Sequence, residues 1–310
     1  AAGEKESADY ALTYGEIRAM NFPKKLSEIN IRDPFVLLDG DYYYMYGTRG
    51  KACSGGKQPG FEVYISADLE NWTDSIEVFG KTEDFWADMN YWAPEVHKYN
   101  GKYYMFASFK SEKRHRGTQI LVSSSPCGRF LPLCDFPVTP PEWECLDGTL
   151  YTDRQGVPYM VFCHEWTQVG DGEICALKLS EDLKHAVGKP IFLFRASSSK
   201  LVSSVRGESN FVTDGPFLYR MKSGKLIMIW SSFGKEGYCE IISYSENGRI
   251  DGKWIHSEMP LFSKNGGHGM IFHTKENDPC FIMHAPNESP RERPVIMKIV
   301  EKDDTIIAVK

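Results

Sequence analysis

The sequence has no apolar run close to the roughly 20 residues that a membrane-spanning helix needs. It also lacks long runs of Lys or Arg, and 36 basic residues against 42 acidic ones give a net charge of −6. This composition argues against a membrane span and against nucleic acid as a partner. No two of the eight cysteines form a C-x-x-C pair, which argues against a zinc ribbon.

Helical periodicity is almost absent as well. Alternating and aromatic-rich runs fill the chain instead, and 27 glycines and 17 prolines supply many turns. We expect the cysteines in strand-like runs to be buried as small apolar residues. A disulfide among the loop cysteines Cys127, Cys134 and Cys145 is possible but not required.

One hairpin pattern recurs five times along the chain. Each copy has a short apolar strand, a polar turn and a second apolar-aromatic strand, as in FVLLDGDYYYMYGT at 35–48. The turn residues lie 54 to 68 residues apart. The copies occupy 35–48, 95–108, 148–163, 216–232 and 269–285, and their turns are centred on Gly40, Gly101, Gly156, Gly224 and Asp278.

A third strand that ends in a Ser- or Asp-rich turn follows each hairpin, as in FEVYISADLENW at 61–72. Five repeats of a three- to four-stranded antiparallel unit predict an all-β protein, a five-bladed β-propeller over 31–310. We expect residues 1–30 to pack on the ring or help to close it. The alternative is a pair of β-sandwiches whose repeats are accidental.

Charged and polar residues stand where the first strand of each repeat begins. Because that strand lines the central channel of a propeller, these residues are expected to crowd around one axis. Several acids close together at the mouth of the central channel cannot all ionise freely. Some of their pKa values therefore rise while others stay low, as general acid and base catalysis requires. An Asp before Gly or Pro can instead simply cap a turn. The residues are Asp33, Trp92, Glu95, Asp147, Asp214 and His268.

Five motifs in order make the chain resemble the family 43 glycoside hydrolases, which are five-bladed propellers acting on arabinose- and xylose-containing glycans. They are RDPF at 32–35, WAPEVHKYNGKYYMFAS at 92–108, LDGTLYTDRQGVPYMVF at 146–162, DGPFLYR at 214–220 and GGHGMIF at 266–272. The resemblance implies that Asp33 is the general base and that Asp147 tunes and orients the proton donor.

The proton donor departs from the family pattern. The family usually has Glu in an EGP motif, whereas this chain has Asp214 in DGP. Aspartate is one methylene shorter, so either the pocket is tighter or another residue donates the proton. We favour Asp214, which stands at the donor position of the resemblance, with Glu165 and Glu208 in reserve.

Further residues are candidates for binding. His268 resembles the histidine that ligates an axial calcium or faces a water-filled site in relatives, so a calcium there is possible although no cofactor is required; a plain hydrogen-bonding role is the alternative. Trp92 and Trp166 can stack on sugar rings, although Trp is more often a core residue. The other substrate-binding candidates are Arg32, Glu95, His164, Glu165 and Arg293.

The resemblance implies an inverting, exo-acting hydrolase that removes terminal pentofuranosyl residues, first an α-L-arabinofuranosidase. A β-xylosidase or β-galactofuranosidase of the same family is an alternative, as is a carbohydrate-binding propeller without catalysis. We expect a monomer that acts on plant-type oligosaccharides or polysaccharides. Such a protein belongs in the periplasm, on the cell surface or outside the cell, although no leader is visible at Ala1–Glu4.

Overall fold

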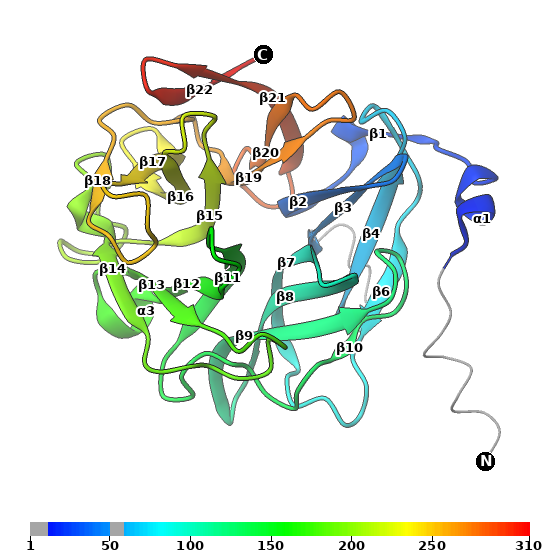
Figure 1. The fold of residues 1–310 in the computed structure, drawn as a ribbon, viewed down its shortest axis with the longest axis horizontal. Coiled ribbons are helices and arrows are strands. Elements are labelled where there is room, and N and C mark those ends of the chain that lie inside the picture. Colours follow the sequence, from blue (N-terminus) through cyan, green and yellow to red (C-terminus); the bar gives the residue numbers. More distant parts are fainter. Residues whose placement is uncertain (1–11, 50–58) are drawn as a thin grey trace.

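The computed structural model, which describes residues 12–49 and 59–310, is a five-bladed β-propeller. Figure 1 shows the blades arranged in chain order around a central axis, which confirms the predicted fold. The innermost strands of blades 1 to 5 are β2 (Ile31–Asp39), β7 (Met89–Tyr99), β11 (Cys145–Thr152), β15 (Asp214–Arg220) and β19 (Gly267–His273).

The second and third strands follow by antiparallel pairing, and the predicted turns join first to second strands. The second strands are β3 (Tyr42–Arg49), β8 (Lys102–Ser111), β12 (Pro158–His164), β16 (Leu226–Gly234) and β20 (Pro279–Ala285). The third strands are β4 (Gly60–Ser66), β9 (Arg114–Ser123), β13 (Glu173–Lys178), β17 (Gly237–Ser245) and β21 (Arg293–Lys302).

Blades 2 to 5 have the four strands that were expected, whereas blade 1 has extra short strands. In blade 1, β5 (Asn71–Trp72) and β6 (Ile76–Gly80) both pair with β4, and β1 (Lys24–Lys25) pairs with β5. The outer strands of the other blades are β10 (Leu131–Pro132), β14 (Ile191–Arg195), β18 (Trp254–His256) and β22 (Thr305–Val309). Short helical turns are α1 (Tyr14–Arg18), η1 (Leu26–Glu28), α3 (Trp166–Val169) and η2 (Ala196–Ser198).

The hydrophobic core is divided among the blade junctions. The described residues form five buried apolar clusters, and each cluster joins two neighbouring blades. In the cluster between blades 1 and 2, for example, Phe61 packs on Phe109 with ring centroids 5.8 Å apart. Because both faces of a blade are covered in this way, its strands are rich in apolar residues on both sides. Most of these apolar side chains lie between neighbouring blades. Phe35 of blade 1 and Phe217 of blade 4, whose blades are not neighbours, also pack together with ring centroids 6.1 Å apart.

In the part of the chain that the structure describes, blades 5 and 1 share no strand where the ring closes, because each blade is built from one continuous stretch of chain. Polar contacts reinforce the apolar cluster at this junction, which we call the seam. Asn30 Nδ2 donates to the carbonyl oxygens of Pro290 at 2.9 Å and Glu292 at 3.0 Å. Arg293 Nε donates to the carbonyl of Ser27 at 3.1 Å.

The segment before the first blade packs on the outside of blade 1. Ile17 of α1 is buried in the cluster of blades 1 and 2, and the rings of Tyr14 and Tyr42 lie 5.4 Å apart. Residues 1–11 of this segment lie outside the described residues.

The seven cysteines in the described ranges are all free, so the possible loop disulfide is not formed there. No helix within those ranges is both long and apolar enough to cross a membrane.

β7 has a further left-handed residue, Asn90 (φ 54°), but every innermost strand carries one such residue at the same point. There the pairing with the second strand shifts register, as in a β-bulge. This conformation is uncommon outside glycine. The residues and their φ angles are Asp33 (53°), Ala93 (49°), Asp147 (58°), Gly215 (50°) and His268 (50°).

Gly215 has a second requirement beyond its φ angle, and substitution tests it. A Cβ atom at this position would lie 2.7 Å from the His268 ring. We expect Gly215→Ala to lower the free energy of unfolding by about 2–5 kcal/mol, the sum of left-handed strain and overpacking. Gly156→Ala is the control, because Gly156 has φ 84° and no atom within 4 Å of the added Cβ. Urea unfolding should show that Gly156→Ala lowers the free energy of unfolding by only about 1–2 kcal/mol. Equal costs for both variants would contradict the packing argument.

Candidate active site

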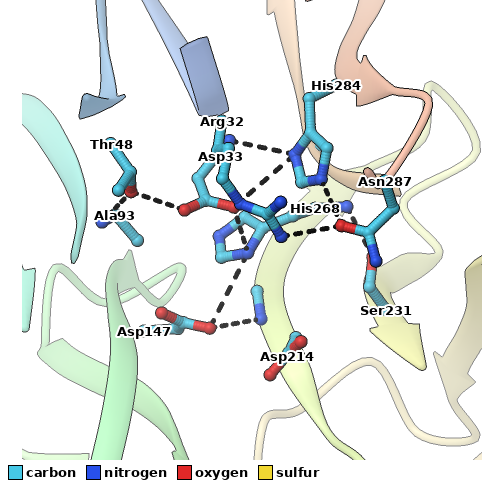
Figure 2. Close-up of polar contacts among 12 residues, drawn as sticks. Arg32, Asp33, Thr48, Ala93, Asp147, Asp214, Ser231, His268, His284 and Asn287 are labelled. Atoms are coloured by element: carbon cyan, nitrogen blue, oxygen red, sulfur yellow. Dashed lines mark hydrogen bonds and ion pairs between the residues drawn. The ribbon is translucent and has the colours of Figure 1, made fainter. Parts of the chain in front are cut away.

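The left-handed residues are held by hydrogen bonds that run between blades, which we call the collar (Figure 2). In four blades the backbone N–H donates to a side chain on the second strand of the preceding blade. In blade 4 the N–H of Gly215 donates instead to Asp147 Oδ2 at 3.0 Å, because Cys163 occupies the equivalent second-strand position. The other acceptors are His284 Nδ1 for Asp33 (3.0 Å), Thr48 Oγ1 for Ala93 (2.7 Å), Ser108 Oγ for Asp147 (2.9 Å) and Ser231 Oγ for His268 (2.7 Å).

Asp33 is held as a carboxylate. The Thr48 hydroxyl donates to its Oδ2 at 2.5 Å, and His268 Nδ1 lies 3.1 Å from its Oδ1. Burial alone would raise the pKa of Asp33, but the charge of His268, with Arg32 and the Thr48 hydroxyl, lowers it below the usual value. The structure therefore places an ionised acid at the start of blade 1.

His268 is the cation that balances the acids. Its Nδ1 also lies 3.8 Å from Asp147 Oδ2, and its ring packs against Gly215. Burial lowers the pKa of His268, but Asp33, Asp147, Asp214 and Glu240 together raise it to about 9. The imidazole is therefore protonated at neutral pH.

Asp147 and Asp214 have the opposite character to Asp33. Burial, with repulsion from Asp214 and Asp33, raises the pKa of Asp147 to about 8. Burial, with repulsion from Asp33 and Glu165, raises the pKa of Asp214 to about 6. The Tyr238 hydroxyl donates to Asp214 Oδ2 at 2.8 Å, which orients this carboxyl and limits the rise in its pKa. The two groups interact, so they share protons as a pair.

Asp214 does not occupy the same register position as the other two acids. Asp33 and Asp147 are themselves the left-handed residues of their blades, whereas Asp214 precedes the left-handed Gly215. Asp214 pairs with Ser231 in the way that Arg32 pairs with Thr48. The three carboxyls therefore reach one site from two different positions of the repeat.

A cavity of about 890 Å³ opens over these groups. Of the residues predicted from the sequence, it brings together Arg32, Asp33, Trp92, Asp147, Glu165, Trp166, Asp214 and His268.

Three predicted binding residues lie away from this cavity, because each has local partners. Glu95 Oε1 is 3.0 Å from His97 Nε2 on the same strand. His164 stacks on Trp143 at 4.1 Å between ring centroids, and its Nε2 lies 2.7 Å from Gln168 Oε1. Arg293 donates to backbone carbonyls at the seam. None of the three is among the residues that line this cavity, and their contact with substrate stays a prediction.

The two reserve glutamates are placed differently. Glu165 lines the cavity, but its Oε2 accepts a 2.6 Å bond from Arg116, which also lies over the Trp92 ring at 4.2 Å. Glu208 is exposed on the loop between blades 3 and 4 and does not line the cavity. Neither arrangement favours these residues as the proton donor over Asp214.

The sequence reading missed several residues of the site. Tyr238 and the buried Glu240 lie on β17, and burial raises the pKa of Glu240 to about 8. Glu240 Oε1 accepts from the N–H of Gly269 at 2.9 Å. Thr48 and His284 lie at equivalent positions of second strands, so aligning the second strands of the repeats offered a signal for them.

The residues around His268 do not fit a cation well. The ring is protonated and its Nδ1 faces Asp33, so it offers no lone pair there. Within 12–49 and 59–310, no group of three or more His, Cys, Asp or Glu side chains is arranged to hold a metal ion. The predicted axial calcium stays a prediction, and no step is assigned to it.

The arrangement supports acid–base chemistry. An ionised carboxylate on blade 1 and two carboxyls with raised pKa values, about 8 for Asp147 on blade 3 and about 6 for Asp214 on blade 4, face one cavity. The first can take a proton from water while one of the others gives a proton to a leaving group.

Comparison with known proteins gives consistent results. The model of glycosyl hydrolases family 43 matches residues 26–305. The structure of an endo-arabinase from Bacteroides thetaiotaomicron VPI-5482 is 41% identical, with a TM-score of 0.85 over 91% of this chain and 98% of that one. An α-L-arabinofuranosidase from Lactobacillus brevis shares the fold at 16% identity, with a TM-score of 0.72 over 94% of this chain and 96% of that one.

A curated relative aligns over a shorter stretch. Extracellular endo-α-(1→5)-L-arabinanase 1 of Bacillus subtilis (strain 168) is 26% identical over 149 residues, which span 45% of each chain. The match thus covers less than half of that relative's length.

The opposite pKa shifts of Asp147 and Asp33 predict opposite effects on stability. The folded protein keeps the Asp147 proton up to about pH 8, whereas an unperturbed Asp loses it near 3.8, so this group destabilises the fold increasingly as the pH rises between these values. We expect Asp147→Asn to raise the free energy of unfolding at pH 7 by on the order of 1–4 kcal/mol, with the gain shrinking towards pH 4.

Asp33→Asn is the matched comparison. Its lowered pKa stabilises the fold above the unfolded value and loses that effect as the pH falls, so this variant should be less stable at pH 7. Urea unfolding of both variants between pH 4 and 8 measures the two trends. Two variants that shift stability in the same direction would show that the charge assignment is incorrect.

Proposed function

This chain belongs to family 43 of the glycosyl hydrolases and is a glycosidase, and we propose that it is an arabinanase that cleaves α-1,5-linked L-arabinan within the chain. One observation supports hydrolysis: an ionised Asp33 shares a single cavity with Asp147 and Asp214, whose pKa values are raised to about 8 and about 6. This internal mode of cleavage replaces the release of terminal sugars that was expected from the sequence.

Two findings support arabinan and internal cleavage. The 41% identical protein that aligns over almost its whole length is an endo-arabinase, and the curated relative is an endo-arabinanase. A cavity of about 890 Å³ lies near the upper end of the usual range for ligand sites, about 300–1,000 Å³, and so has room for more than one pentose ring.

Hydrolysis would proceed by a single displacement with inversion. Asp33, ionised and fixed by Thr48, would activate the attacking water. Asp214 would protonate the leaving oxygen, and the Tyr238 hydroxyl on its Oδ2 would stabilise the carboxylate that remains. In this mechanism the base and acid carboxyls stand about 6.5–9.5 Å apart.

Asp147 would act as a positioning group for the acid. Its Oδ2 accepts the N–H of Gly215, the residue after Asp214, so it fixes the backbone next to the acid. Its own proton keeps it from adding a full negative charge beside Asp214 at neutral pH.

Cavity residues around the acids would hold the glycan. Trp92 and Trp166 offer ring faces, and the guanidinium of Arg206 lies 5.6 Å from the Trp166 ring centroid. Arg32 and Glu165 offer hydrogen bonds to sugar hydroxyls. A polymeric substrate of plant origin places the enzyme outside the cytoplasm, as the name of the extracellular curated relative supports, and we propose that it acts there as a monomer.

Linear α-1,5-arabinan tests the mode of cleavage. An internal cut lowers viscosity after few bonds are broken, so viscosity should fall well before reducing ends approach completion. Chromatography should show oligosaccharides ahead of free arabinose, with little activity on nitrophenyl α-L-arabinofuranoside. Release of arabinose alone at constant viscosity would instead establish terminal cleavage.

Leaving-group dependence tests the acid. A general acid matters most when the leaving group is poor, and it typically raises the reaction rate by about 10²–10⁴-fold. We expect Asp214→Ala to lose about that factor on unactivated arabino-oligosaccharides but far less on a nitrophenyl arabino-oligosaccharide. Glu208→Gln, exposed and outside the cavity, should keep wild-type rates on both. If Glu165→Gln shows this dependence and Asp214→Ala does not, Glu165 is the donor.

A further inference from the structure

The base of the proposed mechanism lies directly at the seam where the ring closes. The backbone N–H of Asp33 on blade 1 donates to His284 Nδ1 on blade 5 at 3.0 Å (Figure 2). His284 is fully buried, and its Nδ1 lies 3.6 Å from Asp33 Oδ1. The last blade of the chain therefore contacts both the backbone and the carboxyl of the base.

The hydrogen bonds fix the tautomer of His284. Nδ1 accepts a hydrogen bond from the backbone N–H of Asp33, so Nδ1 itself carries no proton. Nε2 lies 2.9 Å from Asn287 Oδ1, and an amide oxygen only accepts, so Nε2 carries the proton. The orientation of the Asn287 amide is fixed in turn, because its Oδ1 also accepts from Arg32 Nη2 at 2.7 Å and a guanidinium only donates. His284 is therefore neutral, in agreement with burial that lowers its pKa to about 4.

These bonds close a loop around two adjacent residues. The backbone of Asp33 bonds to His284, His284 to Asn287, and Asn287 to the side chain of Arg32. Asp33 needs such support, because a left-handed aspartate persists only where its surroundings hold it in place. Asn287 belongs to blade 5, so the loop spans the seam.

Histidine does more at this position than the hydroxyls of the collar do. Thr48, Ser108 and Ser231 occupy the equivalent place in other blades. The imidazole forms two hydrogen bonds at once, one with the Asp33 backbone and one with Asn287. Its ring face is also available for stacking. Tyr238, which bonds Asp214, stacks on that face with ring centroids 5.7 Å apart.

We propose that His284, held as the neutral Nε2–H tautomer by Asn287, is a positioning residue that fixes the catalytic base Asp33 across the seam. This inference rests on the proposed function, because it takes Asp33 as the base. It assigns His284 no contact with substrate, so substitution should change turnover rather than substrate affinity.

Substitutions that separate the hydrogen bond from the ring test the proposal. His284→Phe keeps a ring against Tyr238 but removes the acceptor, so kcat on α-1,5-arabinan should fall about 10- to 100-fold with KM changed less than about twofold. His284→Gln offers an amide oxygen to Asp33 and an amide N–H to Asn287, so it should recover most of kcat. Asn30→Leu is the matched control, because it removes two hydrogen bonds of the same seam without touching Asp33. It should lower Tm and leave kcat unchanged.

Two outcomes would overturn the positioning role. One is wild-type kcat in His284→Phe. The other is a loss of kcat that is equal in His284→Phe, His284→Gln and Asn30→Leu, which would show a merely structural effect. An inactive wild type, or an active Asp33→Asn, would count against the proposed function instead.

Nitrogen NMR of the wild-type protein provides a readout that does not depend on the substrate. Between pH 5 and 7, His284 should show a protonated Nε2, an unprotonated Nδ1 and no titration. A proton on Nδ1, or a titration near the ordinary histidine value of about 6.5, would refute the proposal.

Discussion

The collar is the interaction on which the rest of the site depends. At each of the five blade junctions a left-handed backbone N–H donates to a side chain of the preceding blade, which lies on the second strand in four cases and is Asp147 of the innermost strand in the fifth. This bond holds neighbouring blades together. It also fixes the left-handed backbone, which points the side chain of that same residue towards the axis. Where that side chain is Asp33, Asp147 or His268, the geometry that assembles the ring also assembles the chemistry.

The site carries much less charge than its number of acids suggests. Asp147 and Glu240 both have a pKa of about 8 and hold protons at neutral pH, while Asp33 is ionised beside the His268 cation. Asp214, with a pKa of about 6, adds a negative charge that His268 does not balance, so the site has a small net negative charge rather than one charge for each acid. Keeping most of the buried charges paired or protonated lowers the cost of burying them.

The sequence predicts the ring well because the signal repeats five times. Turn residues such as Gly40 and Gly101 and the apolar strands around them identify the blades, and the first residues of each repeat identify Asp33, Asp147 and His268. The position of Asp214, one residue ahead of the left-handed site, is hidden because a bulge shifts the strand register without a visible sequence mark. Glu95, His164 and Arg293 lie close to site residues in sequence but do not line the cavity. Their side chains have partners within the blades or at the seam. Tyr238 comes from a third strand, so only the packing of the blades shows that it reaches Asp214.

Among the described residues, blades 5 and 1 share no strand, and this has a consequence for how the chain can be rearranged. Each blade is one uninterrupted segment, so the chain ends need not fall between blades 5 and 1. A circular permutant that starts at blade 3 would turn the seam into an ordinary covalent linker and open a new gap between blades 2 and 3. Asp33 would then lie in the middle of the chain, bonded to the same His284 as before. The order of the blades around the axis, and not their order from the amino terminus, is what the active site requires.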